Sequence, residues 1–188
     1  GRDGNYTGIK QNVDLTLKNL RQTEGKPLYV RTLYGNGDNI IIQNCRNIIY
    51  RGDANSLSVK DVSILSIAGN WSNINSVSIS NSELQLYTRN NDLPDSHPQR
   101  FKYFRFENIK IPDNIFLLTN SYDIINSTIS GFNIFEIEKG NGQQVLNHTN
   151  NKFLRTNENA VKIDLKTDVN ALLTLTGNSY QNSLPYLI

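Results

Sequence analysis

Apolar and polar residues alternate along most of this chain in short runs, and an Asn or Asp recurs at a fixed place after each run. The stretch NIIIQNCRN, residues 39–47, places Ile40 and Ile42 two residues apart and Asn44 two residues later. Successive side chains of a β-strand point to opposite faces, so each run predicts a short strand with one buried face. Asn tolerates the left-handed backbone region and bonds its own backbone, which predicts a tight turn at this position.

The motif apolar-x-apolar-x-Asn/Asp repeats along the chain. Its copies are Leu15-Leu17-Asn19, Ile40-Ile42-Asn44, Leu57-Val59-Asp61, Val77-Ile79-Asn81, Phe104-Phe106-Asn108, Tyr122-Ile124-Asn126, Leu146-His148-Asn150 and a degraded Leu173-Leu175-Gly177. We call the last residue of each copy the anchor. The anchors are 17 residues apart at the closest step, from Asn44 to Asp61, and 27 apart from Asn81 to Asn108. Helical repeats need a 3.6-residue period that is missing here, and leucine-rich repeats need a leucine frame that is also missing.

A second alternation follows several anchors, such as Ile48-Tyr50 after Asn44, so each repeat is predicted to carry at least two strands. If the repeats stack, their strands pair in parallel with like residues about 4.8 Å apart. The anchor Asn side chains would then form an amide ladder inside the stack. A β-sandwich or jelly roll is the alternative fold, but it does not explain the fixed offset of Asn. The 17-residue step from Asn44 to Asp61 is short for a coil of three strands, so the alignment of these two copies is left open.

The residues of this repeat resemble the right-handed parallel β-helix of the pectate-lyase-like superfamily, over roughly residues 13–180. The resemblance implies an all-β, single-stranded solenoid of about seven to eight coils, roughly 40 Å long. Residues 1–12 are then an N-terminal linker or cap, and residues 181–188 are a C-terminal cap or the start of a following segment. The abundant Asn, Ser and Thr, the absence of Met and the fragment-like ends look most similar to a bacteriophage tailspike or appendage domain. That similarity implies a homotrimer that forms part of a longer chain, at the virion tail surface or otherwise extracellular.

Composition narrows the possible partners. The net charge is +2, from 19 basic and 17 acidic residues without a block of either sign, so the basic stripe of a nucleic-acid partner is missing. The longest apolar runs, such as residues 115–118, are far too short to span a bilayer, and membrane insertion is not expected. The single Cys45 cannot form an internal disulfide. No Asp cluster has metal-ligand spacing, so neither a metal nor a cofactor is expected.

The most conspicuous interruption of the pattern is TRNNDLPDSHPQR, residues 88–100, which two prolines keep out of a strand ladder. One prediction is a loop that binds a glycan, either through sugar hydroxyls or through acidic groups of the glycan. The alternative is a solvated surface loop without a binding role. Aromatic side chains near it and in the connector AGNWSNIN could stack on sugar rings, although a buried Trp71 would instead cap a turn. The candidate carbohydrate-binding residues are Trp71, Tyr87, Asp92, Asp95, His97, Arg100 and Tyr103.

Glycoside hydrolysis needs two carboxyl groups about 5 to 10 Å apart, and Glu107 with Asp92 or Asp95 is the weak candidate pair. Arg105 and Asp123 occupy the same outward position in consecutive copies and are predicted to be neighbours, as a surface salt bridge of small energy.

His148 falls at an inward position and is predicted to be a hydrogen-bonded core residue. Together these features favour a structural and receptor-binding module that recognises host cell-surface polysaccharide. A polysaccharide depolymerase, either glycoside hydrolase or lyase, and a bacterial surface adhesin remain the alternatives.

Overall fold

The computed structural model describes residues 14–21, 26–32, 38–68, 73–87, 99–154, 161–181 and 186–187. Within these ranges the protein is all-β, without a helix, and every strand pairing is parallel. The strands form one large sheet and a separate four-stranded sheet. This architecture excludes the antiparallel sandwich and is compatible with the predicted parallel β-helix.

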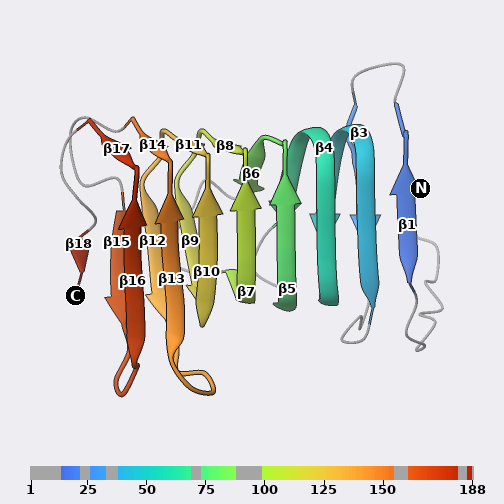
Figure 1. Ribbon diagram of the computed structural model, residues 1–188. Coiled ribbons are helices and arrows are strands. Elements are labelled where there is room, and N and C mark those ends of the chain that lie inside the picture. Colours follow the sequence, from blue (N-terminus) through green and yellow to red (C-terminus); the bar gives the residue numbers. More distant parts are fainter. Residues whose placement is uncertain are drawn as a thin grey trace.

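The strands that carry the repeated motif lie side by side along the molecule, and we call the part of the large sheet that their motif residues form the repeat face (Figure 1). They are β1 (Leu15–Lys18), β3 (Asn39–Arg51), β4 (Ala54–Ala68), β5 (Asn73–Ser80), β7 (Gln99–Glu107), β10 (Ser121–Ile125), β13 (Gln144–Thr149) and β16 (Ala171–Thr176). The long strands β3 and β4 continue past their anchors and leave the repeat face.

The register of the repeat face confirms the alignment of the motif. Ile40 pairs with Leu57, Val77 with Phe104, and Leu146 with Leu173. The 17-residue step is therefore correctly aligned, because Ile42 also lies opposite Val59. A shorter connection between the two copies accounts for the short step without any change of register.

The remaining strands follow the anchors. β2 (Leu28–Arg31) pairs with the second half of β3, and β6 (Leu84–Tyr87) pairs with the second half of β4. The four-stranded sheet contains β8 (Lys110–Ile111), β11 (Thr128–Ile129), β14 (Lys152–Phe153) and β17 (Ser179–Tyr180). A further column contains β9 (Ile115–Thr119), β12 (Asn133–Ile137), β15 (Val161–Leu165) and β18 (Tyr186–Leu187). From β7 onwards, each repeat thus supplies one strand to each of three columns.

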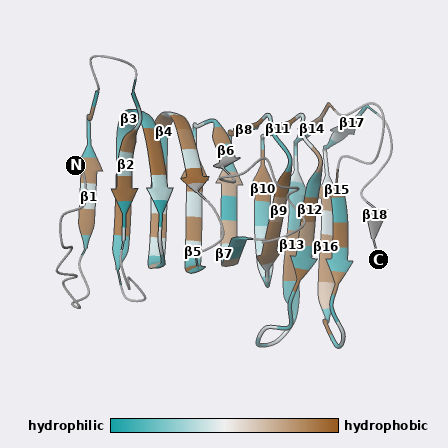
Figure 2. Cartoon of the chain, turned by 180° about the vertical axis from the view of Figure 1, so that it is seen from behind, coloured by the Kyte–Doolittle hydropathy of each residue, from teal (hydrophilic) through white to brown (hydrophobic). Residues whose placement is uncertain are grey.

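The inward residues of these columns form one continuous apolar core, and the strands alternate between apolar and polar residues along their length (Figure 2). Aromatic rings stack from one repeat to the next. The rings of Phe104 and Tyr122 lie 5.0 Å apart at an interplanar angle of 8°, and those of Phe153 and Tyr180 lie 4.6 Å apart at 2°. Parallel register brings like residues together, and such ring pairs add to the free energy gained from burial alone.

The anchors confirm the prediction of a turn. All of the Asn and Asp anchors have a positive φ, from 49° at Asn44 to 59° at Asn19, and Gly177 has a φ of 64°. Asn populates this left-handed region more readily than other non-glycine residues, because its short polar side chain can bond locally. The recurrence of Asn therefore follows from the backbone bend at the end of each repeat-face strand.

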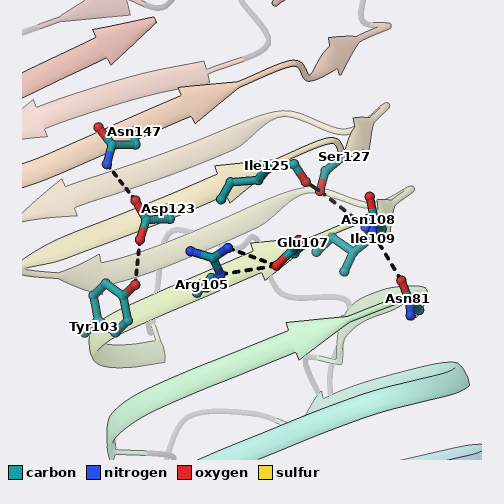
Figure 3. A network of polar contacts seen from close by, with 10 residues as sticks. All are labelled: Asn81, Tyr103, Arg105, Glu107, Asn108, Ile109, Asp123, Ile125, Ser127 and Asn147. Atoms are coloured by element: carbon teal, nitrogen blue, oxygen red, sulfur yellow. Dashed lines mark hydrogen bonds and ion pairs between the residues drawn. The ribbon is translucent and has the colours of Figure 1, made fainter. Parts of the chain in front are cut away.

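The predicted amide ladder exists, but its predicted place inside the stack is wrong. The Nδ2 atom of Asn44 donates to Oδ1 of Asn19 at 2.7 Å, and Asn81 and Asn108 continue the pattern (Figure 3). These anchors are exposed, because a residue at the outside of the bend directs its side chain away from the core. The buried position is the residue that follows the anchor.

Directly after three of the anchors, Asn81, Asn126 and Asn150, lies a buried polar residue whose contacts were not predicted. Ser127 Oγ accepts a hydrogen bond from the Ile109 backbone N–H at 3.2 Å and donates one to the Ile125 carbonyl at 2.8 Å. Ser82 and Asn151 make comparable bonds to the backbone of the preceding repeat, and all three side chains are buried. They satisfy backbone groups that the bend removes from the strand ladder. The signal in the sequence was a polar residue after Asn81, Asn126 and Asn150.

Candidate functional site

Outward side chains of β7, β10 and β13 form the network of polar contacts that Figure 3 shows. In β7 the buried Phe104 and Phe106 alternate with Arg105 and Glu107, whose polar groups reach the solvent. The alternation of the strand thus displays the polar residues on a scaffold that its own aromatic side chains hold in place. We take this outer face of β7, β10 and β13 as the candidate site.

Tyr103, Asp123 and Asn147 form a chain of hydrogen bonds across the three strands. The Tyr103 hydroxyl donates to Oδ2 of Asp123 at 2.6 Å, and the amide of Asn147 donates to its Oδ1 at 2.6 Å. Burial, and to a smaller extent the hydrogen bond to Asp123 and the charge of its carboxylate, together raise the pKa of Tyr103 to about 12. The hydroxyl therefore stays protonated at neutral pH and orients the Asp123 carboxylate, while the Tyr103 side chain keeps 36% of its surface exposed.

Arg105 and Glu107 form an ion pair along β7. Nη2 of Arg105 lies 3.0 Å from Oε2 of Glu107, and Nε of Arg105 lies 3.3 Å from the same oxygen. The Glu107 hydrogen bond holds the pKa of the Arg105 guanidinium above its ordinary value. Arg105 does lie opposite Asp123, as predicted, but its ion pair is made with Glu107 and the predicted salt bridge to Asp123 is replaced.

The carboxylate pair predicted for glycoside hydrolysis is only half described. Glu107 lies on β7, between Ser80 and Ile125 of the neighbouring strands, as the alignment predicted. Asp92 and Asp95 lie outside the described residues, so their pairing with Glu107 stays a prediction.

The other predicted carbohydrate-binding residues are not part of this hydrogen-bond network in the described structure. Arg100 lies in β7, where its Nη2 atom contacts Oε1 of Glu138 at 2.9 Å. Tyr87 ends β6, but the position of its side chain lies outside the described structure. Trp71 and His97 also lie outside the described residues.

His148 is confirmed as a core histidine. Its side chain is fully buried, and its Nε2 atom lies 2.7 Å from the Tyr122 hydroxyl. Its Nδ1 atom has no hydrogen-bond partner. Burial lowers the pKa of His148 to about 4, so the ring is neutral at physiological pH. Because no solvent reaches it, His148 cannot act on a bound polysaccharide.

A further amide ladder, at the start of the repeat-face strands, was not predicted. Asn39 Nδ2 donates to Oδ1 of Asp14 at 2.8 Å, Asn55 Nδ2 to Oδ1 of Asn39 at 3.0 Å, and Asn75 Nδ2 to Oδ1 of Asn55 at 3.2 Å. The sequence held a signal for it, since Asn39, Asn55 and Asn75 each precede an apolar alternation by one or two residues.

No group of three or more His, Cys, Asp or Glu side chains in the described ranges could hold a metal ion. Over the same part of the chain, no helix has the length and apolar character needed to cross a membrane. Comparison with protein-family models, with curated proteins and with solved structures finds no match to this chain.

Proposed function

We propose that this chain is a single-stranded right-handed parallel β-helix of the pectate-lyase-like type, and that it binds a cell-surface polysaccharide of a host. Two observations support the fold: like residues stack in register along the repeat face, and each repeat from β7 onwards supplies three strands. By its resemblance to tailspike domains, the module would act in host attachment, at the virion tail surface.

The binding function is supported by the arrangement of polar and aromatic groups on the outer face of β7, β10 and β13. Tyr103 offers a partly exposed ring, and Asp123 and Glu107 offer carboxylate acceptors whose positions are fixed by hydrogen bonds. Sugars present hydroxyl donors on their edges and C–H groups on their faces, so carboxylates and an aromatic ring match both. Binding groups held by a second set of contacts on rigid strands lose little conformational entropy when a ligand binds.

The length of the repeat face suits a polymer. Its eight strands make seven steps of about 4.8 Å, roughly 34 Å in total. Ser78, Arg105, Asp123 and Asn147 follow one another at equivalent outward positions along this direction. A linear glycan that lies across β5, β7, β10 and β13 would therefore meet a polar side chain on each of these four strands.

We also propose that the module is a homotrimer. Val145 and Leu172 lie opposite each other on the outer side of β13 and β16, with 39% and 48% of their surfaces exposed. Adjacent exposed aliphatic side chains favour burial against another subunit. Sedimentation equilibrium is expected to give three times the mass of the chain, and a monomer at all concentrations would exclude the trimer.

The binding function is tested with an array of oligosaccharides from bacterial capsules and lipopolysaccharides, followed by calorimetry on each positive glycan. Tyr103→Ala and Asp123→Asn are expected to weaken binding about tenfold or more, which corresponds to the loss of one stacking or charged contact. Tyr29→Ala is the matched control, since Tyr29 is 73% exposed on β2, away from the candidate site.

Equal affinity of wild type and both site variants would exclude this face as the binding site. The same incubations are assayed for new reducing ends, because their appearance would indicate a depolymerase. In that case Glu107→Gln tests whether Glu107 takes part in cleavage.

A further inference from the structure

A depression of about 390 Å³ lies where β4, β5 and β7 begin, apart from the outer-face network described above. Its walls are largely polar, and its lining residues are Ala54, Asn73, Ile74, Asn75, Arg100 and Lys102. The chain turns a corner here. In β7 both Lys102 and Tyr103 are exposed between the buried Phe101 and Phe104, so strict alternation is interrupted.

The strand register places two amides opposite two cations in this depression. Asn73 pairs directly with Arg100. Asn75 lies opposite Lys102, since the pairs Ile74–Phe101 and Ser76–Tyr103 flank them on either side. The side chains come from neighbouring strands of one sheet, which keeps their spacing constant.

The amide ladder at the start of the repeat face ends in this depression. In each of its bonds Nδ2 donates towards the preceding repeat, as Asn75 does to Asn55. Oδ1 of Asn75 is therefore left without a following Asn, because Lys102 takes the next place in the column. The ammonium of Lys102 forms no ion pair with another residue in the described ranges.

The other charges near the depression are partly compensated. Arg100 uses Nη2 for Glu138, and a guanidinium has five N–H donors, so most of its donors remain. The Asp53 carboxylate accepts the Asn73 backbone N–H at 2.7 Å. Of the two cations that line the depression, Arg100 has Glu138 as its counterion, whereas the positive charge of Lys102 is in no ion pair within the described ranges. An anionic group would neutralise it and would accept hydrogen bonds from Arg100.

We propose that this depression binds the carboxylate of a uronic acid, so that the polysaccharide recognised by the module is an acidic one. The inference rests on the proposed function and adds the class of sugar. Lys102 and Tyr103 are consecutive residues, so one chain of sugars can place a carboxylate at the depression and a ring against Tyr103. Neutral sugars would contact the outer face alone.

The test is a titration of the isotope-labelled protein, followed by NMR of its backbone amides. Glucuronate is raised through the millimolar range at constant ionic strength, with glucose and glucose 6-sulfate as parallel probes. Glucuronate is expected to cause saturable shifts at Asn73, Asn75 and Lys102, while glucose causes none there. Equal shifts with glucose 6-sulfate would overturn the assignment of a carboxylate, and no saturable shift with glucuronate would overturn the proposal.

Three variants make the titration specific. Lys102→Gln is expected to weaken glucuronate binding about tenfold, and Lys60→Gln, an exposed lysine of β4 on the repeat face, is expected to leave it unchanged. Glu138→Gln is expected to strengthen binding, because it frees the Nη2 atom of Arg100. An equal loss in the Lys102 and Lys60 variants would indicate general charge attraction and would overturn the site.

The same spectra separate this inference from the proposed function. When a uronic-acid-containing glycan identified by the array shifts Tyr103 and Asp123 but not Asn73 or Lys102, the depression is excluded and the outer face stands. When glucuronate shifts the depression alone and no glycan shifts the outer face, the acidic site stands and the outer-face proposal is excluded.

Discussion

The Tyr122 hydroxyl lies 2.7 Å from Nε2 of His148, and both side chains are fully buried in the core. His148 occupies an inward position between Ile124 and Leu175, where the other copies of the motif hold apolar residues. Its Nδ1 atom has no partner, and burial lowers its pKa to about 4. The pair places one ionisable group inside an otherwise apolar column.

His148 is expected to make the protein less stable in mild acid. Its pKa is about 4 in the fold and near 6.5 in an unfolded chain, so the unfolded state binds the proton first as the pH falls. Its contribution to stability is therefore full above pH ~6.5 and is lost progressively towards pH ~4, by roughly 3 kcal/mol. Urea denaturation at a series of pH values measures the free energy of unfolding. His148→Leu should remove this part of the pH dependence, and parallel curves for the two proteins would contradict it.

The control for this experiment concerns Tyr122. In His148→Leu the Tyr122 hydroxyl loses its partner, which costs about 1–3 kcal/mol at neutral pH. Adding Tyr122→Phe removes the hydroxyl and should recover most of that loss. Recovery in the double variant separates the cost of an unpaired hydroxyl from the effect of the charge.

Asn81→Ala is expected to destabilise the protein by about 1–2 kcal/mol. The variant places a residue with a less favourable left-handed conformation at a φ of 49° and removes the hydrogen bonds to Asp61 and Asn108. Asn81→Gly keeps the left-handed backbone conformation accessible, so this variant should lose less stability than Asn81→Ala. Ser78→Ala, at an exposed position on β5, the strand that precedes Asn81, should change the free energy of unfolding by less than about 0.5 kcal/mol. A loss in the glycine variant equal to that in the alanine variant would show that the backbone preference is unimportant.

Gly131→Ala is expected to destabilise the protein more than Gly142→Ala. A Cβ at Gly131 would overlap the backbone carbonyl of Asp113, which cannot move without shifting the neighbouring strand connection, at a cost of roughly 2–4 kcal/mol. Gly142 has a φ of 75° and open space around it, so alanine there meets only the backbone penalty of about 1 kcal/mol. Thermal unfolding of the two variants provides the comparison, and the reverse order would contradict the close approach at Gly131.

Asp123→Asn is expected to lower the pKa of Tyr103 from about 12, while burial keeps it above the ordinary value of 10.0. The change removes the carboxylate that disfavours the tyrosinate, but the surroundings of the ring remain. A titration of the Tyr103 ring signals by NMR measures this shift. The pKa of Tyr50, which burial also raises to about 12, is the internal reference and should stay constant. A Tyr103 pKa that does not respond would indicate that the hydrogen bond to Asp123 is absent in solution.

The alignment of the repeats was predictable because it depends on features that are local in the chain. Apolar alternation marks the strand, and Asn or Asp marks the left-handed turn; both are properties of a few consecutive residues. Even the degraded copy was correctly placed, with Gly177 at a φ of 64° in the anchor position. His148 was correctly assigned to the core on the same basis, by its place in the alternation.

The site was less predictable, because an outward side chain has a choice of partners. Arg105 can reach Asp123 on the next strand or Glu107 two residues along its own strand, and the structure contains the second contact. Asp123 is instead bonded by Tyr103, which is offset by one position, and by Asn147. Several long side chains with similar distances and small energies compete here, and the sequence does not rank them.

The sequence alone determined the parallel register, the position of each turn and the identity of most core residues, because periodicity and backbone preference act over short distances. Only the tertiary structure decided that the anchor ladder of Asn44, Asn81 and Asn108 lies outside, with Ser127 and Asn151 buried beside it. The side of a bend to which a side chain points depends on the path of the backbone through that bend. The same holds for Asn75 and Lys102, which come together only when two repeats stack.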